Sequence, residues 1–224
     1  MGNFALAFLF ISIVLLFVFS FFSIFNYKNR FKMKYDLRNH YLYELNYESK
    51  FTDNLTGNVA ICLFAASGIA FYTLFQNKFN NGFFIFDLVA GSLYSIALMG
   101  LVFIGFKHLK THLIVTLICI VLAFLIPFSN AMACSASYKD TGDGATLALL
   151  IINAVYCLFI FVLMMNPKLS RWADLKEEKN EDGTVKYVRP KFFILAFIEW
   201  LLLLTSPILM LLTYLSSVVI YFCQ

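Results

Sequence analysis

The chain has 224 residues, of which 61% are hydrophobic and only 13% are charged. Soluble domains carry about 25% charged residues, so a water-soluble fold of this size could not hide so much apolar surface. The composition therefore excludes a soluble globular domain and predicts an all-α, polytopic protein of the lipid bilayer.

Six apolar stretches are long enough to be spanning helices, because a helix needs roughly 20 apolar residues to cross the hydrocarbon core. Together they form a single predicted transmembrane domain over residues 1–224. The expected spans are 3–26, 57–76, 83–106, 112–130, 145–165 and 192–222.

Positive charge alternates between the connections that join these spans. Of the 17 Lys and Arg residues, 15 fall in 27–56, 107–111 and 166–191, and the other two are Lys78 and Lys139. Because Lys and Arg in short loops stay on the cytoplasmic side, we predict three cytoplasmic loops and both termini outside. The bias favours a bacterial inner membrane or a plasma membrane, and it explains the net charge of +4 without a nucleic-acid partner.

The first span is apolar on every face, which suits a helix at the periphery of the bundle facing lipid. Its positive charges follow the apolar stretch, whereas a signal peptide carries them before it, so we expect a retained helix.

In the connection 27–56, apolar and polar residues alternate. This pattern predicts either two strands with a turn at Arg38–His40 or a helix on the membrane surface. We predict that loop aromatic residues contact a partner protein: Tyr35, Tyr41, Tyr43, Tyr47 and, in the third cytoplasmic loop, Trp172.

Small residues are concentrated in the second and third spans, for example Gly68 and Gly91. Small residues allow close helix packing in a bilayer, so these two helices are predicted to form the packed centre. Asp87 lies about four residues inside the outer boundary of the third span. It is either an interfacial acid in reach of water or part of an intramembrane polar site.

No sequence motif for a cofactor or a metal is present, and none is expected. His108 and His112 have the i, i+4 spacing that places two imidazoles on one helix face, but a metal site needs further ligands. We therefore interpret them as the basic inner end of the fourth span. Cys134 and Cys223 both fall on the predicted outer side, where a disulfide between them is possible.

Two connections carry signals for local structure. Thr141–Gly144 on the outer side looks like a loop that leads into a helix start. In 166–191, Asn166 and Pro167 indicate the start of a short helix, and Asp182–Gly183 indicates a turn before the extended run 184–188. The loops 27–56 and 166–191 are predicted to pack together as a small cytoplasmic cap.

The sixth span is too long for one crossing, and Pro207 near its middle predicts a kink.

Glu199 in this span, with Asp87, is one of only two acidic residues inside predicted spans. An ionisable group in hydrocarbon is a functional hypothesis by default. The two acids belong to opposite halves of the membrane, so they are not expected to act as a general acid–base pair. Asn153 in the fifth span could join a polar relay between them.

Three functions remain open at this point. The leading hypothesis is a non-catalytic subunit that binds protein partners in the membrane or at its cytoplasmic face. The alternative is a carrier of a small solute or ion, with Glu199 as the coupling carboxylate. An intramembrane enzyme comes third, because no nucleophile–base pair can be assembled from the sequence.

Overall fold

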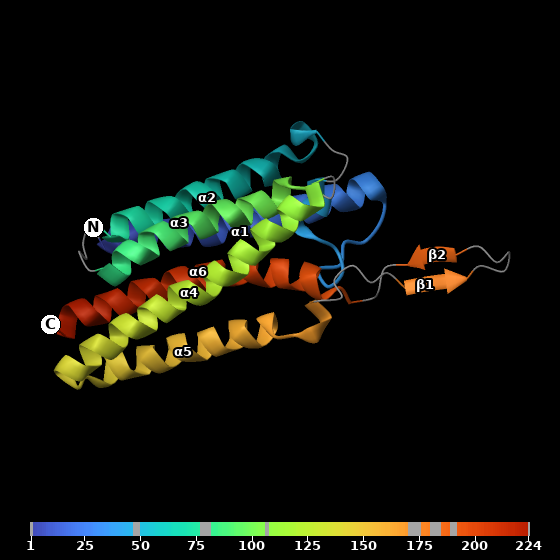
Figure 1. Ribbon diagram of the computed structural model, residues 1–224. Coiled ribbons are helices and arrows are strands. Elements are labelled where there is room, and N and C mark those ends of the chain that lie inside the picture. Colours follow the sequence, from blue (N-terminus) through green and yellow to red (C-terminus); the bar gives the residue numbers. More distant parts are fainter. Residues whose placement is uncertain are drawn as a thin grey trace.

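The computed structural model describes residues 2–46, 50–76, 82–105, 108–169, 176–179, 185–188 and 192–223. Six long helices run side by side as a bundle (Figure 1). They are α1 Gly2–Phe31, α2 Leu55–Gln76, α3 Gly82–Phe103, α4 Leu109–Thr141, α5 Gly144–Met164 and α6 Ile194–Cys223. All six are long and apolar enough to cross a membrane. The prediction of six spanning helices is confirmed, and the chain is a multi-pass membrane protein.

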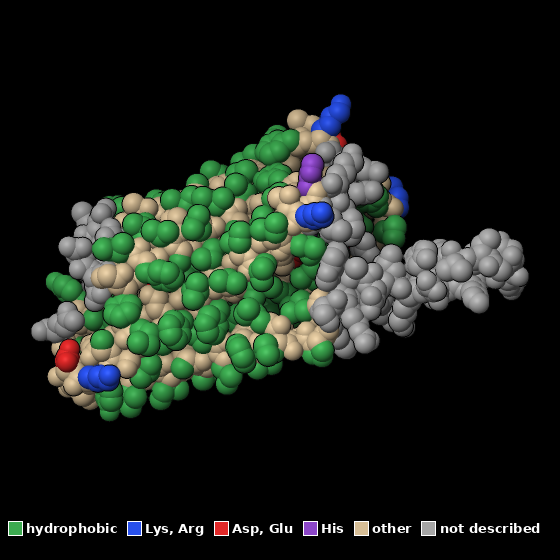
Figure 2. Space-filling model, in the orientation of Figure 1, with side chains coloured by type: hydrophobic (Ala, Val, Ile, Leu, Met, Phe, Trp, Pro, Cys, Tyr) green, Lys and Arg blue, Asp and Glu red, His purple; other side chains and the backbone are tan. Residues whose placement is uncertain are grey.

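Both termini lie at the same end of the bundle in Figure 1. We call the other end, where α1 ends and α2 and α6 begin, the basic end, and we call the end with the termini the terminal end. Figure 2 shows apolar side chains covering the flank of the bundle, with the coloured charged residues near its two ends. Lipid rather than water is the solvent that suits such a surface.

Helix α6 is the centre of the bundle, and it packs against each of the other five helices. It is the most enclosed span, whereas α1 and α5 are the most exposed. The peripheral place predicted for the first span is thus observed. The expectation that the second and third spans form the centre was only partly right. Helices α2 and α3 do pack closely, with Gly68 against Ser95 and Gly91 against the ring of Tyr72, but α6 surpasses both in burial.

The described residues of the connection between α1 and α2, 32–46 and 50–54, form neither strands nor a surface helix, so both expectations for them were wrong. It contains two short 3-10 helices, η1 Leu42–Asn46 and η2 Phe51–Asn54. Tyr35, Tyr41 and Tyr43 are buried. Alternation of apolar and polar residues could not distinguish a strand from a loop that folds back onto the ends of the helices.

Helix α4 extends eleven residues beyond the predicted end of its span, so most of the expected loop 131–144 is helical. Gly142 ends the helix in the left-handed conformation (φ 66°), which glycine adopts readily. Asp143 then caps α5, because its carboxylate accepts hydrogen bonds from the backbone and the hydroxyl of Thr146, both at 2.9 Å. These bonds lower the pKa of Asp143. The helix start predicted after Thr141 is confirmed.

Beyond α5 lie a single 3-10 turn, η4 Pro167–Leu169, and an antiparallel hairpin of β1 Lys176–Lys179 and β2 Val185–Val188. The extended run predicted at 184–188 therefore contains β2. Figure 1 shows the hairpin beyond the basic end of the bundle. The residues of the predicted turn and most of the predicted short helix lie outside the described part of the chain.

Pro207 lies within α6, which continues through it from Ile194 to Cys223. Proline has no N–H for the carbonyl oxygen four residues earlier, which here belongs to Leu203. The hydroxyl of Ser206 donates to that oxygen at 2.7 Å. The helix therefore keeps the acceptor satisfied at the position where it is free to bend.

Candidate functional site

Glu199 lies in the second turn of α6, about 8 Å along the helix from Ile194 at 1.5 Å per residue. Its carboxyl group has no exposure to solvent. The backbone N–H of Phe193, just before the helix, donates to the carbonyl oxygen of Arg38 at 2.8 Å. This bond fixes the start of α6 to the α1–α2 connection and directs the Glu199 side chain beneath it.

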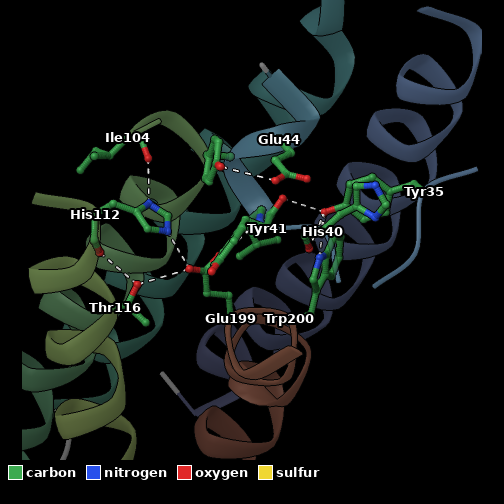
Figure 3. Close-up of polar contacts among 11 residues, drawn as sticks. Tyr35, His40, Tyr41, Glu44, Ile104, His112, Thr116, Glu199 and Trp200 are labelled. Atoms are coloured by element: carbon green, nitrogen blue, oxygen red, sulfur yellow. Dashed lines mark hydrogen bonds and ion pairs between the residues drawn. The ribbon is translucent and has the colours of Figure 1, made fainter. Parts of the chain in front are cut away.

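The partner of Glu199 is His112, in the first turn of α4 (Figure 3). His112 Nε2 lies 2.6 Å from Glu199 Oε1, and both side chains are almost completely buried. The other ring nitrogen, Nδ1, lies 2.7 Å from the carbonyl oxygen of Ile104. A carbonyl oxygen only accepts hydrogen bonds, so Nδ1 carries a hydrogen and the tautomer is fixed.

One proton therefore lies in the bond between Nε2 and Oε1. The pair is either imidazolium with carboxylate or neutral imidazole with carboxylic acid, and its net charge is zero in both forms. The N–H of Leu42 also donates to the carboxyl group at 3.2 Å, and the Thr116 hydroxyl shares its single hydrogen between the carbonyl oxygen of His112 at 3.0 Å and Glu199 Oε1 at 3.4 Å. The donors favour the ionised form of the carboxyl group, whereas its complete burial favours the neutral form.

Aromatic rings from the α1–α2 connection cover the pair on its basic-end side. The rings of Tyr41 and Tyr43 meet the ring of His112 edge-on, with centroids 6.0 and 5.2 Å away. Phe193 packs against Tyr41 at 5.4 Å. These rings separate the pair from the surface of the molecule, and we call the segment Tyr41–Asn46 that carries them the lid.

Tyr35 and Trp200 hold the lid in place. The indole N–H of Trp200 donates to the Tyr35 hydroxyl at 3.0 Å, and that hydroxyl donates to the carbonyl oxygen of Tyr41 at 2.8 Å. Burial raises the pKa of Tyr35 well above its usual range, so the hydroxyl keeps its proton and remains a donor. Because Trp200 follows Glu199 directly in α6, one helical turn both pairs with His112 and anchors the lid.

The polar residues predicted from the sequence do not form one site. Asp87 in α3 is fully buried, so it is not the interfacial acid that its position near a span boundary indicated. Asn153 in α5 donates to the hydroxyl of Ser216 in α6 at 3.1 Å. The structure shows no contact between either residue and the Glu199–His112 pair in the part of the chain that it describes.

The loop tyrosines and the two histidines differ from their predicted surroundings. Tyr35, Tyr41 and Tyr43 face inward, and whether they also meet a partner stays a prediction; Tyr47 and Trp172 lie outside the described residues. His108 is exposed, whereas His112 is buried. No group of three His, Cys, Asp or Glu side chains suited to a metal occurs in the part of the chain that the structure describes. Cys134 and Cys223 are free thiols.

Glu199 was predicted from the sequence, but His112 was not predicted as its partner. The available signal was that both residues lie near the basic ends of their spans. That signal does not show that the fourth and sixth helices touch, because they are not neighbours in the chain.

Comparisons with protein families, with curated proteins and with solved structures find no match for this chain. The class that the fold defines is a multi-pass helical membrane protein with a buried acid–imidazole pair near one end of its bundle.

Proposed function

We propose that this protein is a proton-coupled carrier of a small solute or ion, with Glu199 and His112 as its proton-binding pair. The observation that carries the proposal is the burial of this pair inside a membrane bundle. A buried ion pair is often no more stable than well-packed apolar residues of similar volume. Ionisable groups in spanning helices mark ion and proton pathways in many pumps and transporters. Stability alone therefore does not account for the pair.

The basic end faces the cytoplasm in this proposal, and both termini face outside. Described basic residues at this end include Lys28, Lys34 and Lys50, and Lys139 is at the terminal end. The positive-inside rule supports this orientation, and it suits a bacterial inner membrane or a plasma membrane. The lid is then a cytoplasmic gate.

Protonation of the pair opens this gate. In the closed form the Glu199 carboxylate accepts the Leu42 N–H of the lid, and its charge strengthens that bond. A second proton on the pair removes the negative charge from Glu199 and leaves His112 positive. The charge attraction between α4 and α6 then disappears. The hydrogen bond from the Leu42 N–H of the lid to Glu199 weakens with it, because its acceptor is no longer charged.

Helix α6 can transmit this change toward the terminal end. Glu199 and Thr213 are 14 residues apart in α6, about 21 Å at 1.5 Å per residue, and Pro207 lies between them. The satisfied carbonyl of Leu203 allows the helix to bend at Pro207 without exposing an unpaired acceptor. Pro207 is the hinge in the proposed transport cycle.

Transport into proteoliposomes tests the function. An inward proton gradient is imposed on vesicles that hold the purified protein, a mixture of small metabolites and inorganic ions is added, and mass spectrometry measures what accumulates. We expect at least one solute to accumulate with the wild-type protein, to be lost with a protonophore, and to be lost with Glu199→Gln. Asp36→Asn is the matched control, because Asp36 is an acid at the same end whose ion pair with Arg38 lies at the surface.

Equal accumulation with Glu199→Gln and with the wild type would contradict the proposal. The same holds for a wild-type protein that accumulates nothing beyond protein-free vesicles while a second protein co-purifies with it in mild detergent.

Cysteine labelling tests the orientation. Lys34→Cys and Lys139→Cys are placed at exposed positions of the two ends, in a background where Cys62 and Cys223 are serine. A membrane-impermeant maleimide should label Lys139→Cys in intact cells and Lys34→Cys only after permeabilisation. The opposite pattern would reverse the orientation and would move the lid to the outside.

A second candidate function is an interaction component of a larger membrane complex, and the hairpin supports it. Strands β1 and β2 have four residues each and pair only with one another among the described residues. A two-stranded hairpin of this length is marginally stable alone in water. A partner protein that adds a strand to its edge would stabilise it.

A further inference from the structure

Asp87 has a buried carboxyl group without a hydrogen-bond partner or an ion-pair partner among the described residues. Neither of its oxygens has a hydrogen-bond partner, and the side chain has no exposure. The Ser129 hydroxyl lies beside it but donates to the carbonyl oxygen of Phe83 at 3.2 Å. In the described residues Asp87 makes no ion pair. An isolated buried carboxylate is among the most unfavourable groups in a protein interior.

Oxygen atoms of neighbouring helices form a chain of contacts that begins at this carboxyl group. Asn130 in α4 follows Ser129, and its amide nitrogen donates to the Thr213 hydroxyl of α6 at 2.9 Å, which leaves its Oδ1 without a hydrogen-bond partner. The Tyr72 hydroxyl of α2 lies beside Thr213, and its ring rests on Gly91, one turn after Asp87. These contacts link polar groups of four helices: Asp87 to Ser129 and Tyr72, Tyr72 to Thr213, and Thr213 to Asn130.

Both the charge and the number of these oxygens limit what the site can hold. Asp87 carries the only carboxyl group among them, and none of them is basic, so a monovalent cation gives a neutral site, whereas a divalent ion leaves a net positive charge in low dielectric. Three oxygens lack a partner, namely both of Asp87 and Oδ1 of Asn130. One proton can bridge at most two oxygens, whereas a metal cation takes several at once.

We infer that Asp87 and Asn130, with the hydroxyls of Ser129 and Thr213, bind a sodium ion between α3, α4 and α6. Hydroxyl, amide and carboxylate oxygens are the ligands that hard cations take. The Tyr72 ring packs directly on Gly91, so α2 and α3 approach closely here, and we expect the smaller sodium ion in preference to potassium. The ion supplies the charge partner that the chain does not offer to Asp87. This inference uses none of the residues of the Glu199–His112 pair.

Sodium binding is measured on the purified full-length protein in detergent. Binding of radioactive ²²Na⁺ should saturate at one ion per chain. Sodium chloride should raise the thermal unfolding temperature, while equal concentrations of potassium or choline chloride should not. Asp87→Asn should abolish binding, and Asn130→Ala should weaken it at least tenfold. Glu199→Gln should bind like the wild type, so a failed transport assay and a failed sodium site remain distinguishable.

The unfolding temperature of the Asp87→Asn variant gives a second test. Because the substitution removes an unpaired carboxylate, the variant's unfolding temperature in choline chloride should be at least that of the wild type. Absence of saturable ²²Na⁺ binding to the folded wild-type protein overturns the inference. Sodium binding that is retained in Asp87→Asn overturns the inference as well, and so does tighter binding of potassium than of sodium. The inference also fails if the unfolding temperature changes with pH in the same way in sodium, potassium and choline chloride.

Discussion

Glu199→Ala is expected to lower the free energy of unfolding by about 3–5 kcal/mol, because removing one member of a buried ion pair leaves the other charge uncompensated. His112→Ala should have an effect of similar size, since it leaves the Glu199 carboxylate with only the Leu42 N–H and the Thr116 hydroxyl. Equilibrium unfolding in mixed micelles of a denaturing and a mild detergent measures both losses. The double variant should lose less than the sum of the single variants, because the two side chains act on each other.

Glu199→Gln separates the charge of the pair from its shape. The amide can accept from Leu42 and donate to a neutral His112, so we expect a loss of only about 1 kcal/mol, in the range of one hydrogen bond. Asp36→Asn serves as the surface control, since Arg38 holds the pKa of Asp36 at about 2 but the pair lies in water, where such pairs add little. Equal losses in Glu199→Ala and Glu199→Gln would show that the charge of the pair, and not its shape or its hydrogen bonds, governs its contribution to stability.

Gly91→Ala is expected to destabilise the protein by about 1–3 kcal/mol, the usual range for overpacking a well-filled interior. A Cβ atom at Gly91 would overlap three carbon atoms of the Tyr72 ring, which belongs to α2 and is fully enclosed. The ring cannot move away without separating α2 from α3. The same unfolding experiment measures the effect.

Gly100→Ala is the matched control, because it places the same methyl group in the same helix. The nearest atoms to a Cβ at Gly100 are side-chain carbons of Val115 and Ile104 at 3.5 and 3.6 Å, which is ordinary contact. We expect no loss of stability there, since alanine also favours the helix over glycine. If both alanines were tolerated equally, close packing of α2 on α3 would not be a main source of stability.

The spanning helices could be predicted because each depends on a local property. A run of about 20 apolar residues partitions into lipid whichever helices surround it. The ends were less predictable. The predicted fourth span ended at residue 130, yet α4 continues to Thr141, because Ser129, Asn130 and Ser137 face protein instead of ending the helix.

The α1–α2 connection shows why the loop prediction failed. Tyr35, Tyr41 and Tyr43 alternate with polar residues, as they would in a strand. Their positions are set instead by Trp200, His112 and Phe193, which lie more than 60 residues away in the chain. No local pattern contains that information.

By itself, the sequence determined that six apolar helices enter a membrane and that Glu199 and Asp87 are the ionisable groups that need an explanation there. Only the tertiary structure decided which helices touch. It placed α6 at the centre, His112 against Glu199, Asn130 against Thr213, and Ser129 beside Asp87. The physical reason is that insertion into lipid depends on the summed hydropathy of one segment, whereas the partner of a buried charge depends on contacts between segments far apart in the chain.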